Sequence, residues 1–579
     1  MIETEVAARH SPGAIEQEIL AFELLAERLR CGEITEEEFR PFRLKHGIYG
    51  QRQSGFQMVR VKIPSGLLNP QQLRALAGIA EEFSTGRGHV TTRENCQFHF
   101  VRMGHVPAIM RRLAACGLTT REACGNTVRN VTSCPLAGLC RHESFDVTPY
   151  ALATTRFFLR HPEFPDLPRK FKIAFSGCED DGNCAAAAIH DIGLIARLRG
   201  SNGTARKGFH VLVGGGLGSL PTEAQVFAEF LPEEELFPTL DAILHVFNEH
   251  GNRGNKHKAR MKFVLREKGI EEFKRLVAAK RAEVTTPAEV FTVPPPPLPS
   301  LVPLTPSSSG LNGEGEDYER WLRHNLEPQR QPGFGIIWIK LKAGTVLTRQ
   351  LLGLASLIEK FSLSVIRIAI SQDMILPWTP LHHAAEIYRE LRALDLVTPG
   401  ARTIADVNAC PGATTCNLGI TRSLTLAEVL AEEFAHETDP EIQKIRVKIS
   451  GCPNSCGHHH IAEIGLYGNA RKVEDRQAPY YQLMLAGRVA RDGVRFARQV
   501  MPLPARRIPA ALRSLLNLYQ HTRWNGETFG DWAERTSNAV ILEHLGRYAA
   551  VGDQEADFYV DWGDRETYSL KLGRGECAT

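Results

Sequence analysis

The sequence has no long apolar run, no export signal and little net charge. No apolar stretch among its 579 residues is long enough to span a bilayer. The first residues, Met1-Ile-Glu-Thr-Glu, hold no basic segment followed by an apolar one, so no secretory signal is predicted. A net charge of +3 is small for this length and argues against a general nucleic-acid-binding surface. We therefore expect a cytoplasmic protein with neither membrane nor nucleic-acid partners.

The composition is that of an ordinary folded protein, apart from its cysteines. Hydrophobic residues make up 43% of the chain and charged residues 23%, and the length predicts two or three domains. Disulfides are rare in a reducing cytoplasm. The 13 cysteines are therefore expected as metal ligands or free thiols.

Two cysteine pairs in the last third of the chain form a candidate metal site. Cys410-Pro-Gly-Ala-Thr-Thr-Cys416 is a C-x5-C pair, and Ser450-Gly-Cys452-Pro-Asn-Ser-Cys456 holds a C-x3-C pair. Four thiolates from two loops are enough to ligate a [4Fe–4S] cluster. The Gly, Pro, Asn and Ser residues between them favour turns that curl around a compact group. Structural zinc, whose paired ligands usually stand closer together, and free thiols are the alternatives.

The chain also contains an internal duplication. The segment 333–344 parallels the segment 55–66, an offset of 278 residues, and a helical pattern follows each. Cysteines repeat with nearly the same offset, 276 residues from Cys134 to Cys410 and 274 from Cys178 to Cys452. Three landmarks with such similar offsets predict two α/β copies.

Hydrophobic periodicity predicts the elements of the first copy. Residues 56–64 alternate between apolar and polar side chains as in a strand, with Arg60 on the polar face. A helix follows, with Asn69 as its N-cap. The segment 89–99 is predicted as one further strand.

Further segments carry a resemblance to a known family. They are the strand around Arg60, Thr92-Arg93, Val128-Arg129-Asn130-Val131, Leu167-Pro-Arg-Lys170-Phe-Lys172, Leu212-Val-Gly-Gly-Gly216, Asn252-Arg253 and the two cysteine pairs. Together they resemble the sirohaem/[4Fe–4S] nitrite and sulfite reductases, of the sulfite reductase haemoprotein (beta-component) type. In that family two duplicated halves hold one sirohaem coupled to one [4Fe–4S] cluster. The resemblance runs from about Phe42 to about Ala497.

The resemblance implies an α+β fold in which duplicated ferredoxin-like half-domains are combined with two sirohaem/[4Fe–4S] reductase domains. We expect a helical extension over residues 1–54, half-domains over 55–120 and 316–400, and reductase domains over 121–286 and 401–548. A Pro/Ser-rich linker over 287–315 joins the halves, and residues 549–579 form a C-terminal tail.

By this resemblance the four late cysteines hold the cluster: Cys410, Cys416, Cys452 and Cys456. Cys456 would also bridge to the sirohaem iron. A thiolate shared by the two groups shortens the electron path between them. Asn454, which stands between the last two cysteines, is expected to shape their loop.

Basic residues at family positions are predicted to form the substrate site. Lys170 and Lys172 alternate along a predicted strand, so both ammonium groups point the same way. With Arg60 and Arg129 they are expected to ring a cavity above the iron, collect a small oxyanion and supply protons. A second set resembles the positions that bind sirohaem carboxylates: Arg93, Gln97, His99, Arg253, Arg260 and Lys262.

The glycine run of the first copy does not predict a dinucleotide site. The spacing of Gly214, Gly215 and Gly216 differs from G-x-G-x-x-G, and we expect these glycines to let the backbone approach the macrocycle. No flavin or nicotinamide module is evident in the sequence. Electrons are therefore expected from a separate donor, either ferredoxin or a flavoprotein subunit.

Some cysteines and histidines leave alternatives open. Cys577 in the tail is a redox thiol, a docking element or an idle thiol. The run 458–460 of three histidines is interpreted as solvent-facing or sirohaem-contacting rather than metal-binding. Two more C-x5-C pairs predict either a second cluster or, more simply, buried thiols left by the duplication: Cys134 with Cys140, and Cys178 with Cys184.

The leading hypothesis is the assimilatory six-electron reduction of sulfite to sulfide. Within the family, lysine at the second position of the Lys-x-Lys pair goes with sulfite and asparagine with nitrite, so Lys172 favours sulfite. The closest alternative is reduction of nitrite to ammonia, because His46-Gly-Ile-Tyr-Gly-Gln-Arg52 looks closer to the bacterial nitrite-type branch. A non-catalytic iron–sulfur or zinc scaffold is the alternative from another class.

Overall fold

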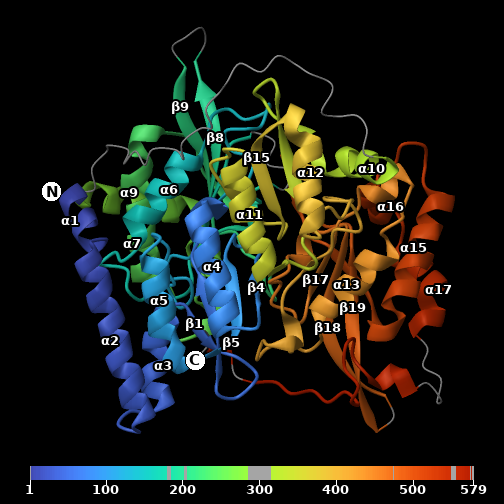
Figure 1. The fold of residues 1–579 in the computed structure, drawn as a ribbon, viewed down its shortest axis with the longest axis horizontal. Coiled ribbons are helices and arrows are strands. Elements are labelled where there is room, and N and C mark those ends of the chain that lie inside the picture. Colours follow the sequence, from blue (N-terminus) through green and yellow to red (C-terminus); the bar gives the residue numbers. More distant parts are fainter. Residues whose placement is uncertain are drawn as a thin grey trace.

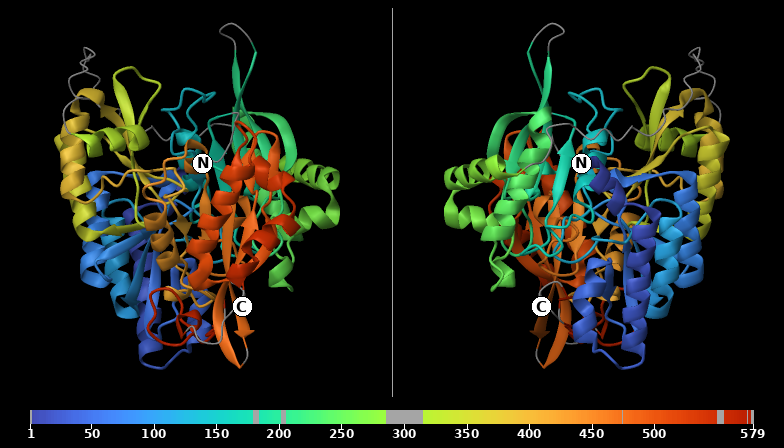
Figure 2. Two further views of the ribbon diagram at one scale, coloured as in Figure 1. Left: turned by 90° about the vertical axis from the view of Figure 1, so that its right-hand side faces the viewer. Right: turned by 90° about the vertical axis from the view of Figure 1, so that its left-hand side faces the viewer.

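The computed structural model describes residues 2–178, 184–200, 205–284, 315–473, 475–549, 556–573 and 575–576. Most of the predicted linker and Cys577 lie outside these residues. The described strands form four five-stranded sheets and one two-stranded hairpin. Two sheets belong to smaller half-domains, which lie together on one side of the molecule, and two belong to larger domains on the other side (Figures 1 and 2).

The first half-domain follows three helices at the amino end. These helices are α1 (Ile2–Arg9), α2 (Pro12–Arg30) and α3 (Glu36–Lys45). The sheet has the order β1-β2-β5-β4-β13. Helices α4 (Pro70–Phe83) and α5 (Val106–Ala114) accompany it. The strands are β1 (Ile48–Gly50), β2 (Phe56–Val61), β5 (Cys96–Arg102), β4 (Arg87–Val90) and β13 (Thr345–Leu347).

The second half-domain repeats this plan with the sheet order β11-β12-β15-β14-β3. Its helices are α10 (Glu316–Asn325), α11 (Thr348–Lys360) and α12 (Ala384–Ala393). Its strands are β11 (Leu326–Pro328), β12 (Phe334–Ile339), β15 (Met374–Pro380), β14 (Ile366–Ile368) and β3 (Leu67–Leu68).

The two half-domains exchange edge strands. Strand β13 of the second half pairs with β4 of the first, where Thr345 lies opposite His89. Strand β3 of the first half pairs with β14 of the second, where Leu68 lies opposite Ile366. Each half therefore completes the sheet of the other.

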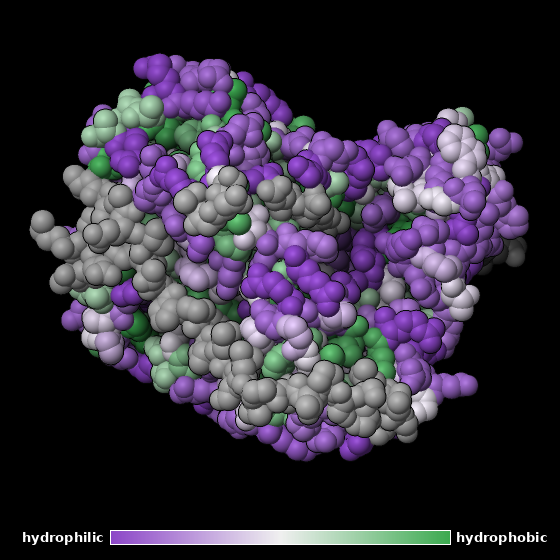
Figure 3. Space-filling view, turned by 90° about the horizontal axis from the view of Figure 1, so that it is seen from above, coloured by the Kyte–Doolittle hydropathy of each residue, from purple (hydrophilic) through white to green (hydrophobic). Residues whose placement is uncertain are grey.

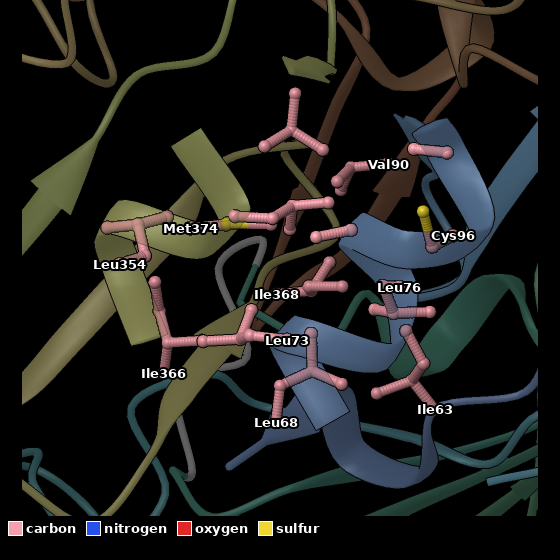
Figure 4. Packing of buried hydrophobic residues seen from close by; sticks show 14 of the residues in the cluster. Ile63, Leu68, Leu73, Leu76, Val90, Cys96, Leu354, Ile366, Ile368 and Met374 are labelled. Carbon is pink, nitrogen blue, oxygen red and sulfur yellow. The ribbon is translucent and has the colours of Figure 1, made fainter. Parts of the chain in front are cut away.

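A single hydrophobic core joins these two sheets. Leu73 and Leu76 of α4 lie in the same buried cluster as Leu354 of α11, Ile366 of β14 and Met374 of β15 (Figure 4). Each such side chain is worth about 1.5–3 kcal/mol when it is fully buried. The half-domains consequently share their stability and form one structural unit.

The two larger domains have sheets of matching topology. In each, three parallel strands are followed by two antiparallel ones, in the sheets β6-β7-β8-β9-β10 and β16-β17-β18-β19-β22. The first sheet contains β6 (Thr132–Ser133), β7 (Ile173–Ser176), β8 (Ile192–Arg199), β9 (Arg206–Val213) and β10 (Gln225–Pro232). The second contains β16 (Asn408–Ala409), β17 (Val447–Ser450), β18 (Ile464–Val473), β19 (Arg476–Leu485) and β22 (Arg498–Pro504).

Helices and one hairpin complete these domains. The first domain has α6 (Thr148–Phe158), α7 (Leu236–His250), α8 (Met261–Lys268) and α9 (Ile270–Glu283). The second has α13 (Ser423–Glu433), α14 (Pro440–Gln443), α15 (Ile508–Thr522), α16 (Phe529–Arg535) and α17 (Asn538–Ala549). Strands β20 (Arg488–Ala490) and β21 (Gly493–Arg495) form the hairpin.

One strand prediction is wrong. Residues 89–99 are not one strand, because β4 ends at Val90, a turn follows, and β5 begins at Cys96. Thr91 and Asn95 close this turn through a backbone hydrogen bond of 3.0 Å, and Glu94 has a positive φ of 54°. Arg93 therefore lies on a turn, and its side chain extends from a loop rather than from the predicted strand.

The tail crosses from the second half to the first, where the Gly50 N–H of β1 donates to the Glu576 carboxylate at 2.7 Å (Figure 1). On its way it contacts the loop after Cys416: Tyr568 donates its hydroxyl to the Ile420 carbonyl at 3.0 Å, and Gly573 donates its N–H to the Asn417 carbonyl at 2.9 Å. The tail is therefore a strap over one of the predicted cysteine loops.

The outer surface matches the composition. Seen from above, it carries mainly hydrophilic side chains and is hollowed near its middle (Figure 3). Among the described residues, no helix is both long and apolar enough to cross a membrane.

Candidate active site

The four late cysteines come together at the carboxyl edge of one sheet. Cys410 follows β16 directly, and Cys452 follows β17 after one intervening glycine. Strands β16 and β17 are parallel, so their carboxyl ends meet at the same edge. The charges of Cys410, Cys416 and Cys456 all act on Cys452. The sheet therefore brings both sequence pairs to one place, as expected.

Backbone N–H groups point at these sulfurs. Gly451 donates its N–H to Cys410 Sγ at 3.2 Å. Backbone hydrogen bonds from Asn454 reach Cys452, and those from Leu418 and Gly419 reach Cys416. Hydrogen bonds to the sulfurs are one of the means by which proteins tune the potential of an iron–sulfur cluster. Asn454, itself exposed, thus acts on the loop through its backbone.

Ionisation of these thiols costs free energy when no metal is bound to them. Burial, followed by the neighbouring charge of Cys456, raises the pKa of Cys410 to about 12. Burial also raises the pKa values of Cys416 and Cys452. A bound metal group offsets this cost because it stabilises thiolates directly.

Glycines allow the loops to close tightly around the sulfurs. A Cβ on Gly451 would lie 2.5 Å from Gly412 Cα, and one on Gly457 would lie 2.0 Å from the Ile449 carbonyl oxygen. No L side chain fits at either position without moving backbone. Four thiols brought together from two such loops are the donor set of a [4Fe–4S] cluster.

Residues of the first half of the chain form hydrogen bonds to the loops that carry the four late cysteines. Thr92 donates its hydroxyl to the Cys456 carbonyl at 2.8 Å. Arg52 donates its N–H to the Thr415 carbonyl at 2.8 Å, and Gln53 donates its side-chain amide to the Thr414 carbonyl at 3.0 Å. The site is thus built between the two halves.

Lys172 lies among cations near Cys456. It directly precedes β7, so neither lysine lies on the strand itself, although half-buried Lys170 and Lys172 do alternate with buried Phe171 and Ile173. Burial comes first among the causes that lower the pKa of Lys172 well below its usual range. The charges of Arg93, Arg260 and Lys170 lower it further, whereas that of Cys456 raises it. Such a lysine releases its proton more readily than an exposed one.

Sequence reasoning missed Asp191, which positions two predicted residues. This fully buried carboxylate accepts two hydrogen bonds from Arg260, at 3.1 and 2.7 Å, and one from the Lys172 backbone N–H at 2.8 Å. The duplication holds the signal that would have revealed it. Glu463 likewise precedes β18 and accepts a hydrogen bond from the Arg446 N–H, just before β17, at 3.0 Å.

Arg93 reaches the same cluster of cations from its turn. Its Nη1 contacts His190 Nε2 at 2.5 Å and donates to Thr132 Oγ1 at 3.2 Å, and its Nη2 donates to the Asn130 carbonyl. The Arg93 Nε is buried with no hydrogen-bond partner among the described residues. A buried donor of this kind is satisfied by a ligand or by water.

A second group of predicted residues lies on neighbouring strands of the first half-domain. Arg60 lies opposite Gln97 across β2 and β5. With its carboxamide oriented to accept, Gln97 receives hydrogen bonds from Arg60 Nη2 at 2.6 Å and Nε at 2.9 Å. Both ring nitrogens of His99 are buried and lack a partner among the described residues, and burial lowers the pKa of His99 to about 3. These orphaned polar atoms also fit a bound cofactor.

Arg129 connects the two groups. It donates to the Gly125 carbonyl at 3.0 and 2.7 Å and to the Ala123 carbonyl at 3.0 Å, and the latter carbonyl also accepts from Arg60 at 3.2 Å. Its Nη2 lies 3.3 Å from the hydroxyl of Tyr49, a residue that sequence reasoning did not single out. The charge of Arg129 acts on Arg93. Arg129 thus lies between Arg60, with which it shares the Ala123 carbonyl, and Arg93, one of the cations that act on Lys172.

The glycine run packs against protein. A Cβ on Gly215 would lie 2.5 Å from the Ala188 carbonyl oxygen, and one on Gly216 would lie 3.2 Å from Arg260 Nη2. Gly214 has a positive φ of 84°. Lys262 donates to the carbonyls of Gly216 and Leu217 at 3.4 and 3.2 Å, and burial lowers its pKa to about 8. The run therefore holds Arg260 and Lys262 in place.

Arg253 lies apart from this cluster, and the histidine run differs from one expectation. Arg253 is on the surface and donates to the Asn248 side chain at 2.6 Å and to the Asp166 carbonyl at 3.1 Å. All three histidines of 458–460 are buried, so the solvent-facing interpretation is wrong. Burial lowers the pKa of His458 well below its usual range, and the charges of Lys448 and Lys172 add to the effect.

Family models match most of this chain. A model described as nitrite and sulphite reductase 4Fe-4S domain matches residues 124–285 and 400–551. A model described as nitrite/sulfite reductase ferredoxin-like half domain matches residues 49–116 and 327–394. The matched ranges follow the two large domains and the two half-domains.

Similar proteins of two kinds are found. The chain is 28% identical over 518 residues to sulfite reductase [ferredoxin] 2 of Mycolicibacterium paratuberculosis, with 84% of this chain and 87% of that protein covered. It is 29% identical over 470 residues to the ferredoxin–nitrite reductase of Synechococcus elongatus, covering 79% and 85%. The structure of Mycobacterium tuberculosis NirA matches with a TM-score of 0.75 at 26% identity, covering 88% of this chain and 92% of that one.

Proposed function

The chain belongs to the nitrite and sulphite reductase family, and from this premise we propose that it reduces sulfite to sulfide with six electrons. The chain is an oxidoreductase whose family implies two cofactors, sirohaem and a [4Fe–4S] cluster. The four late cysteines fit the cluster. The orphaned polar atoms of Arg93 and His99 fit a second bound group beside it.

The observation that carries the choice of sulfite is the position of Lys172. It lies where Arg93, Arg260, Lys170 and Cys456 all act on it. In the family that this chain resembles, lysine at this position goes with sulfite and asparagine with nitrite. Sulfite carries more negative charge than nitrite, so an additional cation favours it.

The protein residues bind the anion and supply protons. When bound, the two cofactors supply the electrons and an iron at which the oxyanion is reduced. Arg60, Arg129, Lys170 and Lys172 form the anion clamp, because each offers N–H donors and positive charge. Lys172, whose pKa is lowered well below its usual range by burial and by the neighbouring cations, gives up its proton more readily than an exposed lysine and serves as the proton donor. Asp191 orients Arg260 and holds the backbone at Lys172.

We propose ferredoxin as the electron donor. The sulfite and nitrite reductases to which the chain is similar are ferredoxin enzymes by name. A flavoprotein subunit is the alternative donor. Turnover with reduced ferredoxin but not with a reduced flavoprotein reductase would support the first choice, and the reverse result would contradict it.

The substrate is tested by comparing kcat/KM for sulfite and nitrite with a reduced viologen as donor. We expect a higher value for sulfite in the natural chain. Lys172→Asn should lower the sulfite value more than the nitrite value. Lys444→Asn, at an exposed lysine, is the matched control and should leave the ratio unchanged.

Two results would contradict the proposal. A clear advantage for nitrite in the natural chain would assign it as a nitrite reductase. A purified protein without a sirohaem absorption band would instead favour the non-catalytic scaffold.

A further inference from the structure

Four cysteines of the first half occupy a site that mirrors the cluster site. Cys134 follows β6 directly, as Cys410 follows β16. Cys178 follows β7 after one glycine, as Cys452 follows β17. Cys140 stands six residues after Cys134, and Cys184 stands six residues after Cys178. We call these four residues the first-half cysteines.

The backbone around them has the same register as in the second half. Cys134 donates its N–H to the Phe175 carbonyl at 2.9 Å, and Cys410 donates its N–H to the Ile449 carbonyl at 3.4 Å. Phe175 and Ile449 are the next-to-last residues of β7 and β17. Three of the first-half cysteines thus match cluster ligands in topology. The fourth, Cys184, stands two residues further along its loop than Cys456 does.

The thiols of the first-half cysteines lie close together. The sulfurs of Cys140 and Cys178 are 3.6 Å apart. Cys134 makes a side-chain contact with Cys184, and the charge of Cys178 also acts on it. None of the four is joined in a disulfide, and Cys134 and Cys178 are buried. The four sulfurs therefore form one cluster of donors.

Each of the two cysteine sites is held by hydrogen bonds from residues of the other half of the chain. Arg52 and Gln53 of the first half bond to the loop of Cys416. In the second half, Arg330 donates its N–H to the Leu139 carbonyl at 2.8 Å, and Gln331 donates its side-chain amide to the Gly138 carbonyl at 3.0 Å. The sequence Gln-Arg-Gln occurs at both places, at 51–53 and 329–331. The loop of Cys140 is consequently held in the same manner as the cluster loop.

A buried cation faces the first-half cysteines. Arg367 of β14 donates to the Pro135 carbonyl at 3.0 Å and to the Ala137 carbonyl at 2.6 Å, and Cys134 is among the groups whose charges act on it. Four thiolates around a cluster carry net negative charge, which a buried guanidinium stabilises.

From this mirrored geometry we propose that Cys134, Cys140, Cys178 and Cys184 ligate a second [4Fe–4S] cluster. The sulfurs of Cys140 and Cys178 must separate to reach different irons. A change of χ1 rotamer moves a cysteine sulfur by about 3 Å, which is enough for this. The proposal does not depend on whether sulfite or nitrite is the substrate.

The test is the iron and acid-labile sulfide content of the anaerobically purified holoenzyme. With four irons in each cube, we expect about eight cluster irons per chain, apart from the sirohaem iron. About four would overturn the proposal. Stoichiometric zinc, or a disulfide between first-half cysteines found by mass spectrometry of the purified enzyme, would overturn it as well.

Variants assign the iron to its site. Cys134→Ser combined with Cys178→Ser should halve the cluster iron while the sirohaem band remains, and unchanged iron would refute the assignment. Cys140→Ser, at a half-buried loop position, provides the same test with less risk to folding. Cys116→Ser is the matched control at a half-buried cysteine outside both sites, and it should keep all the iron. The sirohaem band and turnover report separately on the site of the four late cysteines. Failure of the second-cluster proposal is therefore distinguishable from failure of the proposed reductase activity.

Discussion

Gly451→Ala is expected to remove the cluster held by the four late cysteines. Gly451 lies between β17 and Cys452, and its N–H donates to Cys410 Sγ at 3.2 Å. The new methyl group would lie 2.5 Å from Gly412 Cα and 2.8 Å from the Thr421 carbonyl oxygen. Both contacts are with backbone, which cannot turn aside as a flexible side chain can.

The size of the effect follows from these distances. Carbon atoms in van der Waals contact stand about 3.5–4.0 Å apart, so the two loops must separate by roughly 1 Å. Overpacking of this kind costs about 1–3 kcal/mol. The same displacement moves Cys410 relative to Cys452, and a misplacement of 1 Å in an active site can lower the rate about 10²-fold.

The assay combines bound iron, the visible spectrum and turnover with a reduced viologen. We expect Gly451→Ala to lose the iron of this cluster and to turn over at least about 10²-fold more slowly. Gly546→Ala is the matched control, because a Cβ at that helical glycine meets nothing within 4 Å. It should keep its iron and gain up to about 1 kcal/mol of helix stability.

Retention of full iron content and of turnover within twofold of the natural chain would refute this reasoning. Such a result would mean that the loops of Cys410 and Cys452 do not meet as described. The ligand assignment of all four cysteines would then fail with it.

Three further predictions concern other parts of the molecule. Asp191→Ala should destabilise the protein by about 3–5 kcal/mol, because it leaves the Arg260 side chain, which is only 11% exposed, without its partner; a melting temperature as little changed as that of the exposed control Asp166→Ala would contradict this. His46 has a pKa lowered to about 4 by burial and by Arg121, so the unfolded chain binds the extra proton between pH 6.5 and 4 and stability falls as the pH drops through that window. His46→Gln should flatten the dependence of the free energy of unfolding on pH there, by up to about 3 kcal/mol across the window, and equal slopes would disprove the effect. Deletion of residues 568–579 removes the strap over Asn417 and Ile420 and should speed loss of iron in air; an unchanged half-life of the visible cluster absorption would count against a protective role.

Much of the fold could be predicted because the internal duplication repeats the same sequence pattern in both halves of the chain. The offsets of 274–278 residues revealed two halves, and the alternating pattern around Arg60 defined β2. The cluster loops were also visible, because cysteine spacing and turn-forming residues are local signals. The comparisons confirm the family, the duplicated fold and the enzyme class.

Long-range contacts set the limits of prediction. The turn at Arg93 was missed because polar residues at period two resemble a strand, whereas Thr91 and Asn95 close a turn. Asp191 was missed because a single acidic residue carries no local signal of its contacts, and only its match with Glu463 in the second half would have revealed it. The exchange of β3 and β13 has no local signal either, since short strands pair wherever an open edge lies.

The exchange of strands also determines when the first sheet can be completed during synthesis. Strand β4 leaves the ribosome with its outer edge bare, and its partner β13 emerges roughly 250 residues later. At about 5–20 residues per second, that edge waits roughly 10–50 s for its neighbour. During this interval the nascent chain presents an unpaired strand, which is a template for aggregation. A chaperone that shields the emerging amino-terminal portion would therefore raise the yield of native protein more than one that acts after release.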